Sequence, residues 1–155
     1  MSDAACQLKH LDLGWNLIRG ESGAQFLNGL ASNSSLKYLD IGWNGIDVEA
    51  CGSLGKCLET CILEELDLNH CNITGAGALL IADGLKRNKL LRRITLDCNN
   101  LKQSGARALV KASLGAAQLP CCSQTFVMFA QASEARLTAA YLLPLAAISI
   151  GSALG

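Results

Sequence analysis

The sequence predicts an α/β fold, a right-handed solenoid (a horseshoe segment) with a parallel inner sheet and outer helices. Three observations predict it. The chain repeats itself about every 28 residues, each unit opens on a strand pattern, and each unit continues as a helical pattern. A strand followed by a helix in every unit places successive strands side by side in parallel, joined by right-handed connections.

The repeated pattern is L-x-x-L-x-L-x-x-N-x-L, and four segments match it: Leu8–Ile18, Leu36–Ile46, Leu63–Ile73 and Leu91–Leu101. Successive starts lie 28, 27 and 28 residues apart, which chance would not produce four times in register. The predicted organisation is therefore an N-terminal lead-in and four repeats, followed by a non-repeat apolar C-terminal tail. The boundaries are 1–7 for the lead-in, 8–35, 36–62, 63–90 and 91–118 for the repeats, and 119–155 for the tail.

Each fixed position of the repeat has a mechanical role. The L-x-L pair alternates at period two, so both of its apolar side chains point to the same buried face of a strand. These inward pairs are Leu11/Leu13, Leu39/Ile41, Leu66/Leu68 and Ile94/Leu96. The Asn that follows offers an amide to loop backbone that no ladder satisfies. It occurs at Asn16, Asn44 and Asn99, and Cys71 replaces it in the third unit.

The second half of each unit predicts a helix. A pair of small residues marks its start, at Gly23-Ala24, Ala50-Cys51, Gly77-Ala78 and Gly105-Ala106. Apolar residues then recur at steps of three and four: Phe26/Leu27/Leu30, Leu54/Leu58, Ile81/Ala82/Leu85 and Leu109/Val110/Leu114. Small residues at these sites would let neighbouring helices approach closely, and Cys51 and Cys57 occupy such slots.

These four units resemble the ribonuclease-inhibitor-like class of leucine-rich repeats. That class also occurs in the C-terminal sensors of nucleotide-binding innate immune receptors and in the Ran GTPase-activating protein. The resemblance covers Leu8 to about Gln118 and implies a scaffold that binds another protein, of unspecified identity, on its open sheet face. It specifies the fold better than the function, because one repeat architecture serves many partners.

Composition limits the other function classes. The 13 basic and 13 acidic residues balance, so no global field predicts binding to nucleic acid. The chain opens without a basic and then apolar signal, so its eight cysteines predict reduced thiols in a cytoplasmic protein. No pair of C-x-x-C knuckles predicts zinc, no catalytic motif is present, and neither a metal nor a cofactor is expected. The sequence therefore predicts a protein that is not an enzyme.

The open face of the sheet is the candidate binding site. Equivalent positions of adjacent strands align about 4.8 Å apart. One predicted row holds Trp15, Trp43, His70 and Cys98, and another holds Asp12, Asp40, Asp67 and Thr95. Trp15 and Trp43, with Tyr38 and His70 beside them, are predicted to form the apolar centre of a contact, with His10 on the same face.

Each part of this site has an alternative explanation. The tryptophans could lie flat over their own loops as local packing. The aspartates could be solvated, or paired with Lys9 and Lys37. Glu64/Glu65 and Arg92/Arg93, on neighbouring strands, predict a cross-strand patch of ion pairs that could orient a partner.

Two further functions are alternatives to partner binding. The resemblance to the Ran GTPase-activating protein implies a GTPase activator, for which Arg19 is the one residue to nominate. The stretch Leu137–Gly155 carries no charge and is nearly long enough to span a bilayer, which would give a membrane-tethered adaptor. It would otherwise cap the last repeat or form a poorly ordered tail. Because Leu8 opens a repeat almost at once, the chain is also interpreted as a fragment of a longer array or an edge-paired oligomer.

Overall fold

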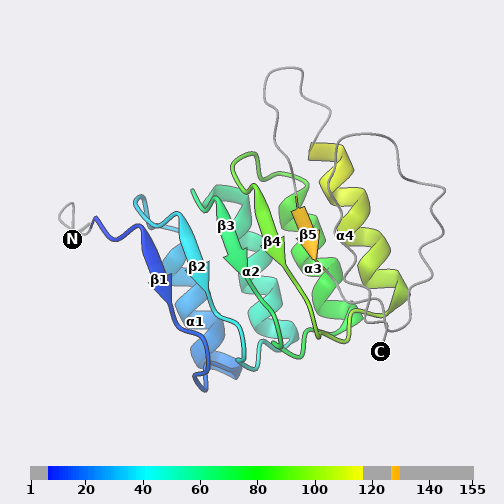
Figure 1. Cartoon of the computed structure of the whole chain (residues 1–155), viewed down its shortest axis with the longest axis horizontal. Helices are drawn as coiled ribbons and strands as arrows, with labels where there is room; N and C mark the ends of the chain where they lie inside the picture. The colour runs from blue at the N-terminus through cyan, green and yellow to red at the C-terminus, as the bar shows by residue number, and fades with distance from the viewer. Residues whose placement is uncertain (1–6, 117–126, 130–155) are drawn as a thin grey trace, which may run out of the picture.

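A computed structural model describes residues 7–116 and 127–129 of the chain. Strands and helices alternate along it (Figure 1): β1 (His10–Asp12), α1 (Gly20–Leu30), β2 (Tyr38–Asp40), α2 (Val48–Thr60), β3 (Glu65–Asp67), α3 (Gly75–Leu85), β4 (Arg93–Thr95), α4 (Lys102–Ala116) and β5 (Val127–Phe129). All strands are parallel and lie in one sheet in chain order. The helices form a second layer on one side of it (Figure 1). The predicted α/β solenoid is confirmed.

The register of the sheet follows the sequence repeat. Leu11 aligns with Leu39, Leu39 with Leu66, and Leu66 with Ile94, so the same repeat position forms one continuous row. From the second repeat onward the predicted inward pairs are at most 2% exposed. Leu11 and Leu13 are only half-buried, because no described repeat covers the outer side of the first one.

The asparagine positions satisfy loop backbone, as predicted. Asn44 is 7% exposed, and its Nδ2 donates to three carbonyl oxygens while its Oδ1 accepts the N–H of Ile18 at 3.0 Å. Asn99 repeats this arrangement two repeats further along the array. At Cys71 the thiol contacts the carbonyl of Ile41 at 3.1 Å, and the cysteine's own backbone carbonyl accepts the N–H of Ile46.

The helices begin earlier than the small pairs indicate. Asp47 caps α2 by accepting the backbone N–H of Ala50 at 2.9 Å, and Thr74 caps α3 in the same way. A polar N-cap therefore sets each of these starts, and the small pair falls within the first turn. The small residues instead serve close contact between helices, since a Cβ added at Gly77 would lie 2.6 Å from the Sγ of Cys51.

The sheet extends one strand further than the four predicted repeats supply. β5 pairs in parallel with β4, with Ile94 aligned to Met128. The remainder of the predicted 119–155 tail, including Leu137–Gly155, lies outside the described residues. Within the described part of the chain, no helix is both long and apolar enough to cross a bilayer.

Candidate functional site

Three rings stack at the ends of the first three strands. The ring centroids of Trp15 and Trp43 are 4.0 Å apart at an interplanar angle of 12°, and those of Trp43 and His70 are 3.7 Å apart at 13°. We call these three side chains the aromatic column. The structure thus brings together three members of the predicted row, and Cys98 holds the equivalent position in the fourth repeat, where it is exposed.

The backbone beneath the aromatic column is in the left-handed region. Trp15, Trp43 and His70 have φ values of 58°, 56° and 53°. This conformation favours Gly, and after it Asn, Asp and His, and it costs other L-residues about 1–2 kcal/mol each. The loop imposes it through backbone hydrogen bonds, such as the 2.8 Å bond from the N–H of Trp43 to the carbonyl of Asn69. Backbone preference therefore does not explain why tryptophan occupies two of these positions.

The aromatic column is open to solvent. Trp15 is 73% exposed and Trp43 is 43% exposed. Both faces of Trp43 are covered by neighbouring rings, whereas the contacts with described rings cover only one face of Trp15. The tryptophans therefore stack on one another across the first two repeats. Each such aromatic pair contributes about 0.5–1.5 kcal/mol beyond area burial.

The aspartates that precede the column form what we call the acidic row, Asp12, Asp40 and Asp67. Each uses its Oδ1 to accept the backbone N–H two residues later, at 2.8, 2.7 and 2.8 Å respectively. The first role of these carboxylates is thus to hold the turn that follows each strand. Lys37 pairs with Glu64 rather than with this row, and no described Lys or Arg forms a salt bridge to any of the three.

The acidic row concentrates negative charge. A Cβ added at Gly42 would lie 3.1 Å from the Oδ1 of Asp40 and 3.3 Å from that of Asp67, so the two carboxylates approach the same point. Burial, followed by the charges of Asp67 and Asp12, raises the pKa of Asp40 against the opposing hydrogen bond from Gly42. Burial and the charges of Asp40, Asp67 and Asp12 also raise the pKa of Tyr38.

Neutralising Asp40 is expected to stabilise the folded protein. Its pKa is higher in the folded state than in the unfolded chain, so stability falls as pH rises through that interval. The variant Asp40→Asn keeps an acceptor for the N–H of Gly42 but lacks the charge. Its melting temperature should exceed that of the parent at neutral pH, and the difference should vanish below the unfolded aspartate pKa of about 3.9.

Asp83→Asn is a control for which the opposite change in melting temperature is expected. The hydrogen bond from Lys86 lowers the pKa of Asp83, so neutralising this carboxyl removes a stabilising charge. Thermal unfolding followed by circular dichroism at neutral pH and at about pH 3 measures both variants. A lower melting temperature for Asp40→Asn at neutral pH would show that the carboxylate charge is not repelled in the folded state.

The ring contacts place Tyr38 away from the aromatic column. Its ring lies 5.6 Å from that of His10 at a tilt of 32°, on the first residues of β2 and β1. Tyr38 and His10 therefore form a separate pair beside the acidic row, and only His70 joins the tryptophans. The face carries two aromatic groups where the sequence predicted one centre.

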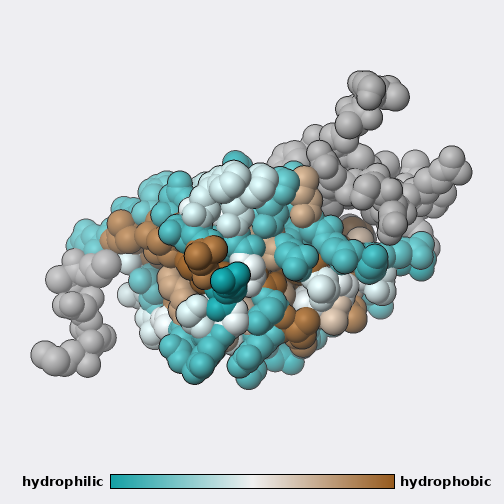
Figure 2. All heavy atoms as spheres, turned by 90° about the horizontal axis from the view of Figure 1, so that it is seen from below, coloured by the Kyte–Doolittle hydropathy of each residue, from teal (hydrophilic) through white to brown (hydrophobic). Residues whose placement is uncertain are grey.

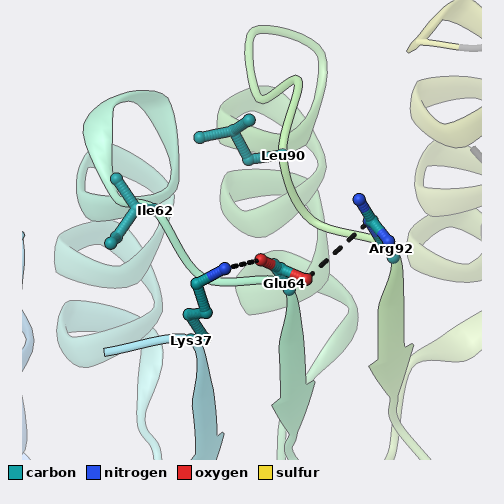
Figure 3. A pocket seen from close by; sticks show the side chains of 5 residues that line it. All are labelled: Lys37, Ile62, Glu64, Leu90 and Arg92. Atoms are coloured by element: carbon teal, nitrogen blue, oxygen red, sulfur yellow. Dashed lines mark hydrogen bonds and ion pairs between the residues drawn. The ribbon is translucent and has the colours of Figure 1, made fainter. Parts of the chain in front are cut away.

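A shallow hollow of about 230 Å³ lies at the start of β2, β3 and β4 (Figure 3). Glu64 lies between Lys37 and Arg92 and pairs with both, the second contact at 3.9 Å, while Ile62 and Leu90 form the apolar rim. Arg93 and Glu65 pair at 3.3 Å, so the predicted cross-strand patch is confirmed. Because these charges satisfy one another, the hollow presents little unpaired polarity to a ligand.

Four described cysteines are buried free thiols: Cys51, Cys57, Cys61 and Cys71. Burial raises the pKa of Cys51 to about 12 and that of Cys71 to about 11, which disfavours the reactive thiolate. The described residues hold no group of three or more His, Cys, Asp or Glu side chains suited to a metal ion. Cys6, Cys121 and Cys122 lie outside the described residues.

Arg19 lies where the loop after β1 meets the loop after β2. It is the N-cap residue of α1 and forms an isolated parallel bridge with Gly45. A Cβ added at Gly45 would lie 3.1 Å from the Cβ of Arg19, so the two loops are in close contact here. No contact of Arg19 in the described structure favours the GTPase-activator alternative.

Sequence reasoning missed one exposed apolar residue near the column. Figure 2 shows the molecule from the end where the strands finish, and hydrophobic surface gathers towards the N-terminal repeat. Leu17, in the loop after β1, is 78% exposed. The repeat pattern contained a signal for this residue. The equivalent position, just before the final Ile or Leu of the pattern, holds glycine or asparagine in the other units: Gly45, Asn72 and Asn100.

A family model described as Leucine Rich repeat matches residues 32–55 and 61–82. The matched segments contain strands β2 and β3, the first parts of the helices that follow them, and Trp43 and His70 of the aromatic column. They coincide with two of the structural units that alternate strand and helix. Leucine-rich repeats generally mediate contacts between proteins.

Proposed function

Because the chain is a leucine-rich-repeat solenoid, we propose that it is a protein–protein interaction module whose partner lies on the open sheet face and the aromatic column. The single observation that carries this proposal is the stacked, exposed column of Trp15, Trp43 and His70. We also propose a cytoplasmic location, because the cysteine content predicts reduced thiols.

The column has the properties of an interaction hot spot. Rings bury large area while losing little rotamer entropy, and these rings already hold one another in place before any partner arrives. Their backbone conformation favours small polar residues, so Trp at two of these positions costs stability. A binding role explains why large rings stand where Asn or Gly would fit the backbone better.

The test replaces Trp43 with asparagine. Asn tolerates a positive φ, so relief of backbone strain should offset much of the lost stacking and the fold should survive. Truncating a hot-spot aromatic typically costs about 2 kcal/mol or more. We therefore expect the dissociation constant for the partner to rise at least tenfold, measured by calorimetry on a partner identified by affinity capture and mass spectrometry.

A matched control is Leu79→Asn. Leu79 is 48% exposed, similar to Trp43, but it lies on α3 in the helical layer. This variant should bind the partner as the parent does. If Trp43→Asn stays folded and binds with unchanged affinity, the column is not the contact site. If Trp43→Asn unfolds, the column serves packing and the site assignment is wrong.

A further inference from the structure

The acidic row is a preorganised set of charges to which no described Lys or Arg forms a salt bridge. Asp12 and Asp40 are fixed by hydrogen bonds from Gly14 and Gly42, so their carboxylates do not need to be ordered when a partner binds. The point where a Cβ of Gly14 would lie is 3.2 Å from the Oδ1 of Asp12 and 3.5 Å from that of Asp40. Two carboxylates thus stand close together, and glycine leaves the space beside them clear.

Three basic side chains are engaged at the start of the strands. Lys37 pairs with Glu64, Arg92 with Glu64, and Arg93 with Glu65. None of these cations neutralises the acidic row. Among the described residues no salt bridge joins a Lys or Arg, Lys9 included, to these three aspartates. The described part of the open face therefore carries a negative stripe, although the chain as a whole carries no net charge.

The aromatic column offers positive charge a second type of contact. The outer face of Trp15 is not covered by a described ring, and the side chain is 73% exposed. The face of an indole attracts cations more strongly than that of any other side chain. Arginine suits this surface better than lysine, because its planar guanidinium both stacks on a ring and binds carboxylates with two parallel hydrogen bonds.

We infer that the partner presents a cationic segment to this face, with an arginine stacked on Trp15 and basic charge held by Asp12 and Asp40; this inference rests on the proposed function. Asp12 and Asp40 are like charges that approach the same point beside Gly14. Burial raises the pKa of Asp40, and the charges of Asp67 and Asp12 raise it further. A bound cation relieves that repulsion, so part of the binding energy is already present as strain between like charges.

The test uses synthetic peptides as probes: hexa-arginine, hexalysine and hexaglutamate, each with a fluorescent label, titrated with the full chain and followed by anisotropy. Hexa-arginine should bind more tightly than hexalysine, and hexaglutamate should not bind. Affinity for hexa-arginine should fall as salt is added, because the carboxylates are partly exposed. Equal binding of hexaglutamate and hexa-arginine would overturn the inference.

Two variants locate the site. The double variant Asp12→Asn, Asp40→Asn keeps both turn-holding acceptors and removes both charges, so hexa-arginine affinity should fall at least tenfold. Asp83→Asn, on α3, removes one charge elsewhere and should change it less than twofold. Trp15→Asn should abolish the preference for arginine over lysine while leaving binding of both peptides measurable. Unchanged binding by the double variant would refute the assignment.

The same variants separate this inference from the proposed function. Suppose that Trp43→Asn no longer binds the natural partner, whereas the Asp12→Asn, Asp40→Asn double variant still binds it. The module then binds through its aromatic column, and the partner segment is not cationic. If Trp43→Asn binds the natural partner with unchanged affinity, the proposed function is contradicted, regardless of the peptide titrations. Loss of partner binding in both variants supports both conclusions.

Discussion

Replacing Leu39 with alanine is expected to lower the free energy of unfolding by about 2–5 kcal/mol. Leu39 is fully buried on β2, and the register places it between Leu11 and Leu66 in the central row of the core. Removing three carbons there leaves a cavity that the flanking strands cannot close without breaking their pairing. Urea unfolding followed by circular dichroism measures the loss.

Leu79→Ala is the matched control for this loss. Leu79 is 48% exposed on α3, so the same truncation leaves no cavity and should change stability by less than about 0.5 kcal/mol. Similar effects of the two substitutions would mean that the central row is not the core of the solenoid. The proposed binding site should be unaffected by Leu79→Ala.

Gly84→Ala should be comparably severe, although it adds only one methyl group. A Cβ at residue 84 would lie 2.0 Å from the carbonyl oxygen of Gly55 and 2.8 Å from its Cα. The backbones of α2 and α3 are therefore in direct contact, and the helices must separate to admit the methyl group. Overpacking of this kind costs about 1–3 kcal/mol, and we expect the upper end because backbone atoms cannot rotate away.

The matched control for Gly84 is another helical glycine. A Cβ added at Gly29, in α1, meets no atom within 4 Å. Alanine has the higher helix propensity, so Gly29→Ala should stabilise the protein by about 0.5–1 kcal/mol. Opposite signs for the two substitutions, read from the same urea unfolding curves, are the expected result. A neutral Gly84→Ala would show that the two helices are not in backbone contact.

The repeat made the sheet predictable because period and register carry the same information. Once equivalent positions recur every 27 or 28 residues, parallel pairing aligns Leu39 with Leu66 and Glu65 with Arg93 without further knowledge. The helix starts were predicted too late because the small pairs mark close approach between helices. The side-chain acceptors Asp47 and Thr74 determine where the backbone turns helical.

The candidate site was predictable as a row but not as a stack. Alignment of Trp15 with Trp43 follows from the repeat, whereas their left-handed backbone depends on loop hydrogen bonds that the spacing does not encode. The separation of Tyr38 from the column likewise depends on where each ring turns. The strand β5 could not be predicted, because Val-Met-Phe at 127–129 lacks the leucine pattern of the other units.

The stack of Trp15 on Trp43 also gives the molecule an optical property. The protein contains two tryptophans, and their rings lie 4.0 Å apart, close enough for their electronic transitions to couple. The ultraviolet circular dichroism of that pair therefore reports contact between the first and second repeats alone. Solenoid repeats interact chiefly with their neighbours, so terminal units are free to open separately. If the coupled signal disappears at lower denaturant than the helical signal, the first repeat detaches while the rest of the array stays folded.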